Sequence, residues 1–184
     1  MYVKNQKNVN KVHKIISCLK TLEFKPHIKK FEDRLILQKV IYLLKLNGVD
    51  TGFDYGFYIR GPYSPELTRE MYCQQNAFEN LDSKLKLTPE ENKKVEELKR
   101  LFGLDPGLLE VAATYGYFVI EKKLSPVEAL KRVKKFKSFF SETQLAVGIS
   151  RFKQLLFRPS AEEIAGMKQE VAVWQKVAIK RLGG

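Results

Sequence analysis

The chain has 184 residues, about the length of one domain, and 44% of them are hydrophobic, including 12 Phe, 8 Tyr and 1 Trp. This composition can form a substantial core, which excludes wholesale disorder, and 11 Gly and 7 Pro are too few for a collagen-like or low-complexity chain. The 33 Lys and Arg outnumber the 21 Asp and Glu, so the net charge is +12.

The sequence shows no sign of secretion or membrane insertion. Residues 1–14 are polar and lack the apolar centre of a signal peptide, and the longest nearly apolar run, 111–120, is too short to cross a bilayer. Cys18 and Cys73 are too few for a disulfide framework and fit free thiols. We therefore expect a cytoplasmic protein that does not associate with membranes.

Helices dominate the predicted secondary structure. Capping boxes with Pro at the first helical position mark helix starts at 88–91 and 125–128, and Ser141 and Ser160 begin similar boxes without Pro. Apolar residues spaced by three and four continue from these starts, as on one face of a helix. We predict about eight helices, near 8–22, 28–47, 64–80, 88–102, 106–122, 126–138, 141–156 and 160–182.

Residues 53–60 differ from the rest of the chain. Aromatic and apolar residues alternate there with others, from Phe53 to Ile59, which predicts one short strand or extended segment. The sequence offers no convincing partner for this strand. The segment either pairs with another short extended stretch or lies along the helices.

No internal repeat and no linker rich in Pro, Gly or Ser divides the chain. We predict a mostly α fold in which 1–184 forms a single multi-helix domain, with helices 8–22 and 160–182 as additions at its ends. The last helix carries one apolar stripe, which either packs on its own domain or forms a homodimer seam. The stripe consists of Ile164, Met167, Val171 and Trp174.

The positive charge is concentrated in two blocks. Residues 1–45 have a net charge of +8 and residues 125–158 a net charge of +6. Within the second block Lys131, Lys134 and Lys135 share one helix face. Three interpretations remain open for this face: a solvated surface, a contact with the phosphates of nucleic acid, or a contact with an acidic protein.

No pattern of residues predicts catalysis or a bound metal or cofactor. The histidines His13 and His27 lack a Cys, His or carboxylate at metal-ligand spacing, and no phosphate-binding loop or nucleophile motif occurs. We expect no enzymatic activity and no cofactor. An enzyme would require carboxylates far apart in the sequence to converge in the fold.

The residue types at 61–65 indicate a stiff turn that leads into a helix. Gly61 permits a backbone conformation or a close approach denied to other residues, Pro62 stiffens the turn, and Ser64 with Pro65 begins a helix. Arg34 and Gln38 are polar residues within the otherwise strongly apolar helix predicted over 28–47. We predict that Gln38, and Arg34 through a charge-assisted bond, satisfy the backbone of this turn.

Two interpretations of the turn remain open. It is either a rigid element of the core or a recognition surface. In the second case Tyr58, Arg60 and Tyr63 supply the aromatic and guanidinium contacts that are enriched in binding hot spots. These three residues are the candidate partner-binding site.

Two segments in this order resemble a known family. Residues 34–44 (RLILQKVIYLL) lead through a turn to residues 55–67 (YGFYIRGPYSPEL), and residues 108–114 and 137–149 resemble later elements. This arrangement is similar to the YwgA-like proteins and the related Panacea, or SocA-like, domain group. The resemblance covers about 28–157.

The resemblance implies a role in protein–protein contact rather than catalysis. Panacea domains often act as antitoxins beside toxins, and at least one branch acts as a proteolytic adaptor. The expected function is thus a non-enzymatic protein-interaction module, antitoxin- or adaptor-like. The alternative is a nucleic-acid-binding protein that uses its basic helix faces.

Overall fold

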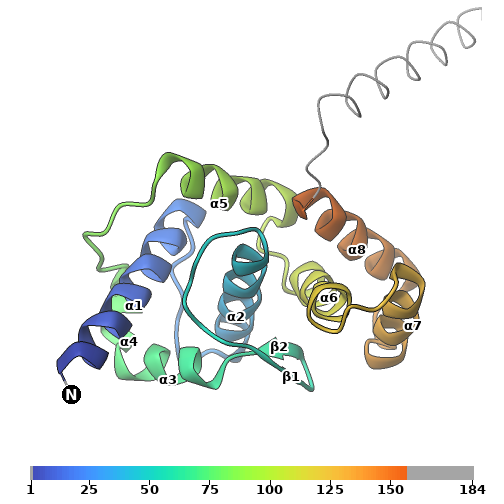
Figure 1. Cartoon of the computed structure of the whole chain (residues 1–184), viewed down its shortest axis with the longest axis horizontal. Coiled ribbons are helices and arrows are strands. Elements are labelled where there is room, and N and C mark those ends of the chain that lie inside the picture. The colour runs from blue at the N-terminus through green and yellow to red at the C-terminus, as the bar shows by residue number, and fades with distance from the viewer. Residues whose placement is uncertain (1, 157–184) are drawn as a thin grey trace, which may run out of the picture.

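The computed structural model describes residues 2–156, with side chains from Asn10 onward. Over these residues the protein has eight α-helices, one π-helical turn and a two-stranded antiparallel sheet, which confirms the predicted mostly α fold (Figure 1). The elements in chain order are α1 (Tyr2–Leu22), α2 (Phe31–Leu46), β1 (Gly56–Tyr58), β2 (Gly61–Tyr63), α3 (Pro65–Cys73), α4 (Gln75–Asn80), α5 (Pro89–Phe102), α6 (Pro106–Gly116), η1 (Tyr117–Glu121), α7 (Pro126–Phe136) and α8 (Glu142–Leu156).

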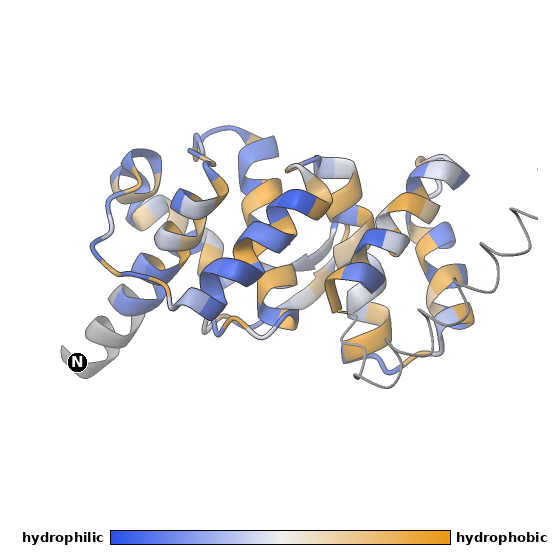
Figure 2. Ribbon diagram, turned by 90° about the horizontal axis from the view of Figure 1, so that it is seen from above, coloured by the Kyte–Doolittle hydropathy of each residue, from blue (hydrophilic) through white to orange (hydrophobic). Residues whose placement is uncertain are grey.

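Helix α2 forms the centre of the core. Every residue from 36 to 44 is buried, because this stretch is apolar nearly all round and neighbours cover it on several sides. Helices α5 and α6 and strand β2 contact α2, while α1 packs on α5 and α8 packs on α6 (Figure 1). Hydrophobic and hydrophilic residues alternate along the outer helices, as expected for helices with one face turned inward (Figure 2).

Side-chain caps begin the helices where the sequence predicts. The boxes at Thr88 and Ser125 are both complete, with the hydroxyl accepting from the backbone N–H of the third residue and the glutamate accepting in return. Ser64 and Asp105 cap α3 and α6 by accepting from the N–H of Leu67 and Leu108, whose side chains cannot return the bond, and each cap precedes a proline. These bonds satisfy backbone donors that the first helical turn leaves without partners.

The predicted lone strand has a partner directly after it in the sequence. Strand β1 covers only 56–58, and it pairs with β2 through Gly56 opposite Tyr63 and Tyr58 opposite Gly61. Ile59 and Arg60 form the turn between the strands. The prediction missed β2 because Pro62 lies in it, and proline usually argues against a strand. Proline is tolerated here because the sheet has only two strands.

Four predicted helices differ in extent from those observed. The first, expected over 8–22, begins earlier, at Tyr2. The helix expected over 64–80 is two helices, α3 and α4, which meet at Gln74 with a non-helical backbone. The helix expected over 106–122 continues past α6 as η1, and that expected from 28 begins at Phe31. No helix among residues 2–156 is long and apolar enough to cross a membrane. The predicted helix 160–182, with the stripe of Ile164, Met167, Val171 and Trp174, lies outside the described residues.

Candidate functional site

Gln38 joins α2 to the turn that begins α3. Its side-chain Nε2 donates to the carbonyl of Ser64 at 2.9 Å, and its Oε1 accepts from the N–H of Ser64 at 3.0 Å. Nε2 also lies 2.9 Å from the hydroxyl oxygen of Thr68. The two sequence motifs are thus one structural unit. Arg34, however, does not bond this turn as predicted: it donates to the carbonyl of Ile28 at 2.7 Å.

Gly61 and Lys39 hold the other end of the turn. The backbone of Gly61 has φ of +88°, and a Cβ at this position would lie 2.6 Å from the Thr114 hydroxyl on α6. Only glycine fits both the left-handed backbone and the close approach. The Nζ of buried Lys39 donates to the carbonyl of Pro62 at 2.6 Å. Strand β2 is therefore fixed against α2 and α6.

A buried ion pair lies beneath the hairpin. Lys137 donates to Oε1 of Glu110 at 2.6 Å, and the two side chains are 0% and 2% exposed. The same ammonium lies 3.3 Å from the carbonyl of Ile59 at the hairpin turn. Arg60 approaches the other carboxylate oxygen of Glu110 at 3.7 Å. Glu110 thus faces two cations, with Lys39 as a third cation nearby.

Burial is the main cause that lowers the pKa of the two lysines under the hairpin, and neighbouring cations add to it. Burial lowers the pKa of Lys39 to about 7; Glu110 opposes this shift, whereas the positive charges of Lys137 and Arg60 add to it. Burial also lowers the pKa of Lys137, and the hydrogen bond to Glu110 opposes that change. Lys39 therefore loses its proton at a much lower pH than an exposed lysine does.

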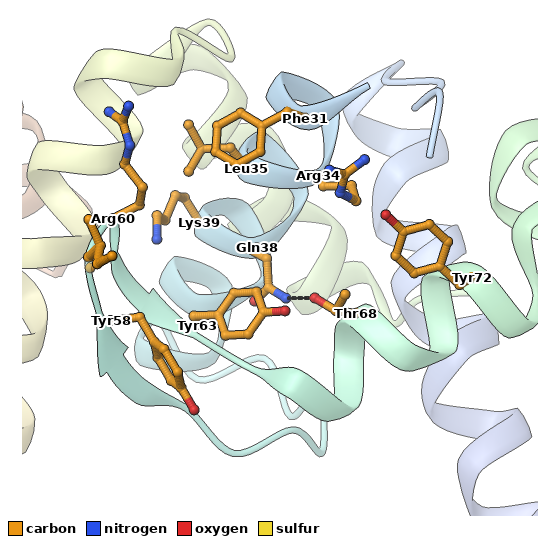
Figure 3. Close-up of a pocket in the computed structure, with 12 residues that line it drawn as sticks. Phe31, Arg34, Leu35, Gln38, Lys39, Tyr58, Arg60, Tyr63, Thr68 and Tyr72 are labelled. Atoms are coloured by element: carbon orange, nitrogen blue, oxygen red, sulfur yellow. Dashed lines mark hydrogen bonds between the residues drawn. The ribbon is translucent and has the colours of Figure 1, made fainter. Parts of the chain in front are cut away.

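A hollow of about 380 Å³ opens between α2, the hairpin and α3 (Figure 3). We call it the aromatic hollow, and its volume is that of a small-molecule or side-chain pocket. It is lined by Phe31, Arg34, Leu35, Gln38, Lys39, Tyr58, Ile59, Arg60, Gly61, Tyr63, Thr68 and Tyr72. Its walls combine aromatic rings with three cationic side chains.

The hollow brings together the three predicted partner-binding residues. The rings of Tyr58 and Tyr63 pack edge to face with centroids 5.0 Å apart. The side chain of Arg60 is half exposed and lies 5.4 Å from the Phe139 ring centroid. Arg60 and Tyr58 are therefore accessible to a partner, whereas Tyr63 is partly covered.

Several residues of this site were not singled out in the sequence. Phe31 and Tyr72 flank Arg34, whose guanidinium carbon lies 5.9 and 5.6 Å from their ring centroids. Glu110 and Lys137 form the ion pair beneath. A signal for Lys137 exists, since it follows buried Ala129 and Val133 at spacings of four. It therefore continues the inward face of α7 at the residue directly after that helix.

The basic residues predicted to contact nucleic acid lie elsewhere. Lys131, Lys134 and Lys135 are exposed on α7, and none of them lines the aromatic hollow. Lys134 forms an ion pair with Glu142 at 2.8 Å.

The basic residues described on α1 have partners within the domain. Lys14 pairs with Glu91 at 2.6 Å, Lys11 lies 3.5 Å from Glu66, and Lys20 donates to the carbonyl of Ser83 at 2.6 Å. Much of the positive charge in the part of α1 with described side chains thus contacts other elements of the fold.

Taken together, these features define a mostly helical domain with an aromatic, cationic hollow at a rigid hairpin. Among the described residues no group of three or more His, Cys, Asp or Glu is arranged to hold a metal ion. Comparisons of the chain with protein-family models, with curated proteins and with solved structures find no significant match.

Proposed function

We propose that this protein is a non-enzymatic protein-interaction module that binds a partner protein through the aromatic hollow. One observation carries the proposal: the fold gathers exposed aromatic side chains and arginines around a single concave site. Tyr58 is 50% exposed, and Phe31 and Tyr72 are 58% and 51% exposed. Aromatic residues and arginine are the types that dominate binding energy at protein interfaces.

The rigidity of the site supports this role. Gln38, Lys39 and the conformation of Gly61 fix the hairpin, and the buried Lys137 fixes the turn at Ile59. A surface that is already ordered loses less conformational entropy when it binds. The hollow therefore needs little rearrangement to receive a partner.

The resemblance to YwgA-like and Panacea proteins supports the same class of function. We propose on that basis an antitoxin- or adaptor-like role. We further propose that the protein works in the cytoplasm, where Cys18 and Cys73 stay reduced; both are free thiols, one buried and one exposed.

Affinity capture with matched variants tests the proposal. The tagged full chain, its Arg60→Ala variant and its Arg132→Ala variant are used to capture proteins from nuclease-treated lysate of cells that express the protein. Arg132 is exposed on α7 and lies outside the hollow, so it controls for loss of surface charge. We expect a stoichiometric partner with wild type and Arg132→Ala that is lost with Arg60→Ala at an unchanged thermal midpoint. A partner retained equally by all three contradicts the proposal.

Nucleic-acid binding is the second candidate, and the exposed Lys131 and Lys135 on α7 favour it. Binding through phosphate contacts predicts an affinity that falls steeply as salt rises. The test is a titration of mixed-sequence DNA and RNA at several salt concentrations with wild type and a Lys131→Ala/Lys135→Ala double variant. Absent or salt-insensitive binding removes this candidate.

A further inference from the structure

A second hollow adjoins the aromatic hollow. It measures about 350 Å³, and we call it the Phe139 hollow after the ring at its outer wall. Phe31, Leu35 and Arg60 line both hollows, so the two share a wall. Phe140 completes the apolar lining of the second one. Together the two adjoining hollows offer a longer site that suits a stretch of chain better than a single small molecule.

The rim of this double site is apolar and exposed. Ile59 at the hairpin turn is 92% exposed and Phe139 is 61% exposed. The exposed Phe31 lies on the shared wall between them. Clustered apolar side chains of this size on a surface mark contact with another protein rather than with solvent. An occupant must therefore bring apolar side chains of its own.

The charge of the site changes from one hollow to the other. Arg34, Lys39 and Arg60 line the aromatic hollow, and no Asp or Glu is among its described lining residues. Glu32 and Glu110 line the Phe139 hollow. The aromatic hollow therefore favours a carboxylate, whereas in the Phe139 hollow Lys137 and Arg60 balance Glu110, and Glu32 disfavours a carboxylate. A nucleic-acid strand carries a phosphate at each step and would place one against Glu32, so a protein segment with a local acid fits better.

The guanidinium groups can reach a carboxylate. Arg60 is half exposed, and its distance of 3.7 Å to Glu110 is beyond that of a hydrogen bond. Arg34 uses one N–H for the carbonyl of Ile28, and a guanidinium carries five such donors. Each arginine therefore keeps donors for the planar, charge-assisted contacts that carboxylates form.

We propose that the double site binds a short segment of a partner protein in which an Asp or Glu neighbours a bulky apolar residue. The carboxylate lies against Arg60, which lines both hollows, and the bulky apolar side chain enters the Phe139 hollow. This inference rests on the proposed function and specifies the chemistry of the partner.

Selection from a random linear peptide library tests the inference. Peptides are selected on the immobilised full chain, and the enriched sequences are synthesised and titrated against wild type, Arg60→Ala and Arg132→Ala. We expect an acid beside a bulky apolar residue in the enriched peptides. Binding should weaken roughly tenfold or more with Arg60→Ala and remain unchanged with Arg132→Ala.

A double-mutant cycle identifies the contact itself. The acid of the best peptide is replaced by its amide and titrated against wild type and Arg60→Ala. If the carboxylate meets Arg60, the two changes remove the same interaction and the combined loss is well below the product of the separate losses. Losses that simply multiply overturn the assignment of the carboxylate to Arg60.

The remaining outcomes separate this inference from the proposed function. Enriched peptides without an acid, whose binding is lost with Tyr58→Ala, overturn the inference and leave the interaction module standing. The inference is also overturned, and the interaction module again stands, if no peptide is enriched but affinity capture yields a partner that the Arg60→Ala variant no longer binds. Failure of both experiments overturns both proposals. An oligonucleotide that binds in a salt-dependent manner and is lost with Arg60→Ala also overturns both.

Discussion

Lys137 and Glu110 form a 2.6 Å ion pair between residues 27 positions apart in the sequence, and both side chains are buried. Glu110 belongs to α6, while Lys137 directly follows α7. Through its contact with the carbonyl of Ile59, Lys137 also ties the hairpin turn to this pair. The shape of the aromatic hollow thus depends on an interaction outside it.

Glu110→Gln tests how much this ion pair contributes to the stability of the fold. The amide keeps nearly the same shape but removes the negative charge, so Lys137 remains buried beside Arg60 and Lys39 with no carboxylate to balance it. We expect the free energy of unfolding, measured by urea titration, to fall by on the order of 3 kcal/mol.

A surface pair with the same separation provides the control. Glu23 and Lys99 also lie 2.6 Å apart, but their side chains are 80% and 36% exposed. Solvent screens this pair, so Glu23→Gln should leave the free energy of unfolding unchanged within error. Equal losses in the two variants would show that burial does not set the importance of the Glu110 pair.

Gly61→Ala should disturb the hairpin in two ways. Its backbone has φ of +88°, and the added Cβ would lie 2.6 Å from the Thr114 hydroxyl. Gly103 also has positive φ, of +53°, but open space surrounds the site of its Cβ. Gly103→Ala therefore measures the backbone strain alone, and Gly61→Ala should cost about 1 kcal/mol or more beyond it. Adding Thr114→Ala to Gly61→Ala should reduce this difference in the free energy of unfolding between the two glycine variants. An unchanged difference would mean that the Thr114 hydroxyl does not clash with the added Cβ.

Local signals predicted the helices because the chemistry of helix starts is itself local. The boxes at Thr88 and Ser125 need only residues within three positions of each other. The bend at Gln74, which divides the helix expected over 64–80, has no glycine or proline to mark it. The hairpin turn of Ile59 and Arg60 likewise lacks the Asn-Gly type of signal that identifies tight hairpins.

The candidate site was predictable only in part. Tyr58, Arg60 and Tyr63 lie close together in the sequence, so the sequence alone could group them. The ion pair of Glu110 with Lys137 depends on how α6 and α7 pack, which no local pattern encodes. Lys137 belongs in the sequence to the basic block 125–158, whereas the fold buries its side chain completely.

Lys39→Met should change the pH dependence of stability. The pKa of Lys39 is about 7 in the folded protein against an ordinary value of 10.5, so the unfolded chain binds more protons between these values. Wild-type stability therefore gains from this residue as pH rises from about 7 to about 10, by at most roughly 1.4 kcal/mol per pH unit. The variant lacks this gain.

The comparison is made by urea titration at about pH 6 and about pH 9. Relative to wild type, Lys39→Met should be more stable at the lower pH than at the higher one. Lys137 titrates in both proteins, so its contribution largely cancels in the difference. A stability difference that stays constant with pH would mean that Lys39 keeps its ordinary pKa in the folded protein.

Gln38→Glu should destabilise the turn in a pH-dependent way. Gln38 both donates to and accepts from the backbone of Ser64, and it is 2% exposed. An ionised carboxylate cannot donate, so the carbonyl of Ser64 loses its partner and faces a negative charge, at a cost of about 1–3 kcal/mol. The protonated carboxyl can donate, so the folded state raises the pKa of the introduced group. The loss should therefore grow as pH rises above about 4.

Gln154→Glu supplies the matched control for this substitution. Gln154 is exposed on α8, and its amide bonds only the hydroxyl of Ser150 among the described hydrogen bonds, at 3.2 Å. Its replacement should alter the free energy of unfolding by no more than about 0.5 kcal/mol at any pH. Because Gln38 also lines the aromatic hollow, the Gln38→Glu variant should weaken partner capture above about pH 4 together with stability. If stability falls while capture is unchanged, the partner does not depend on the position of the turn.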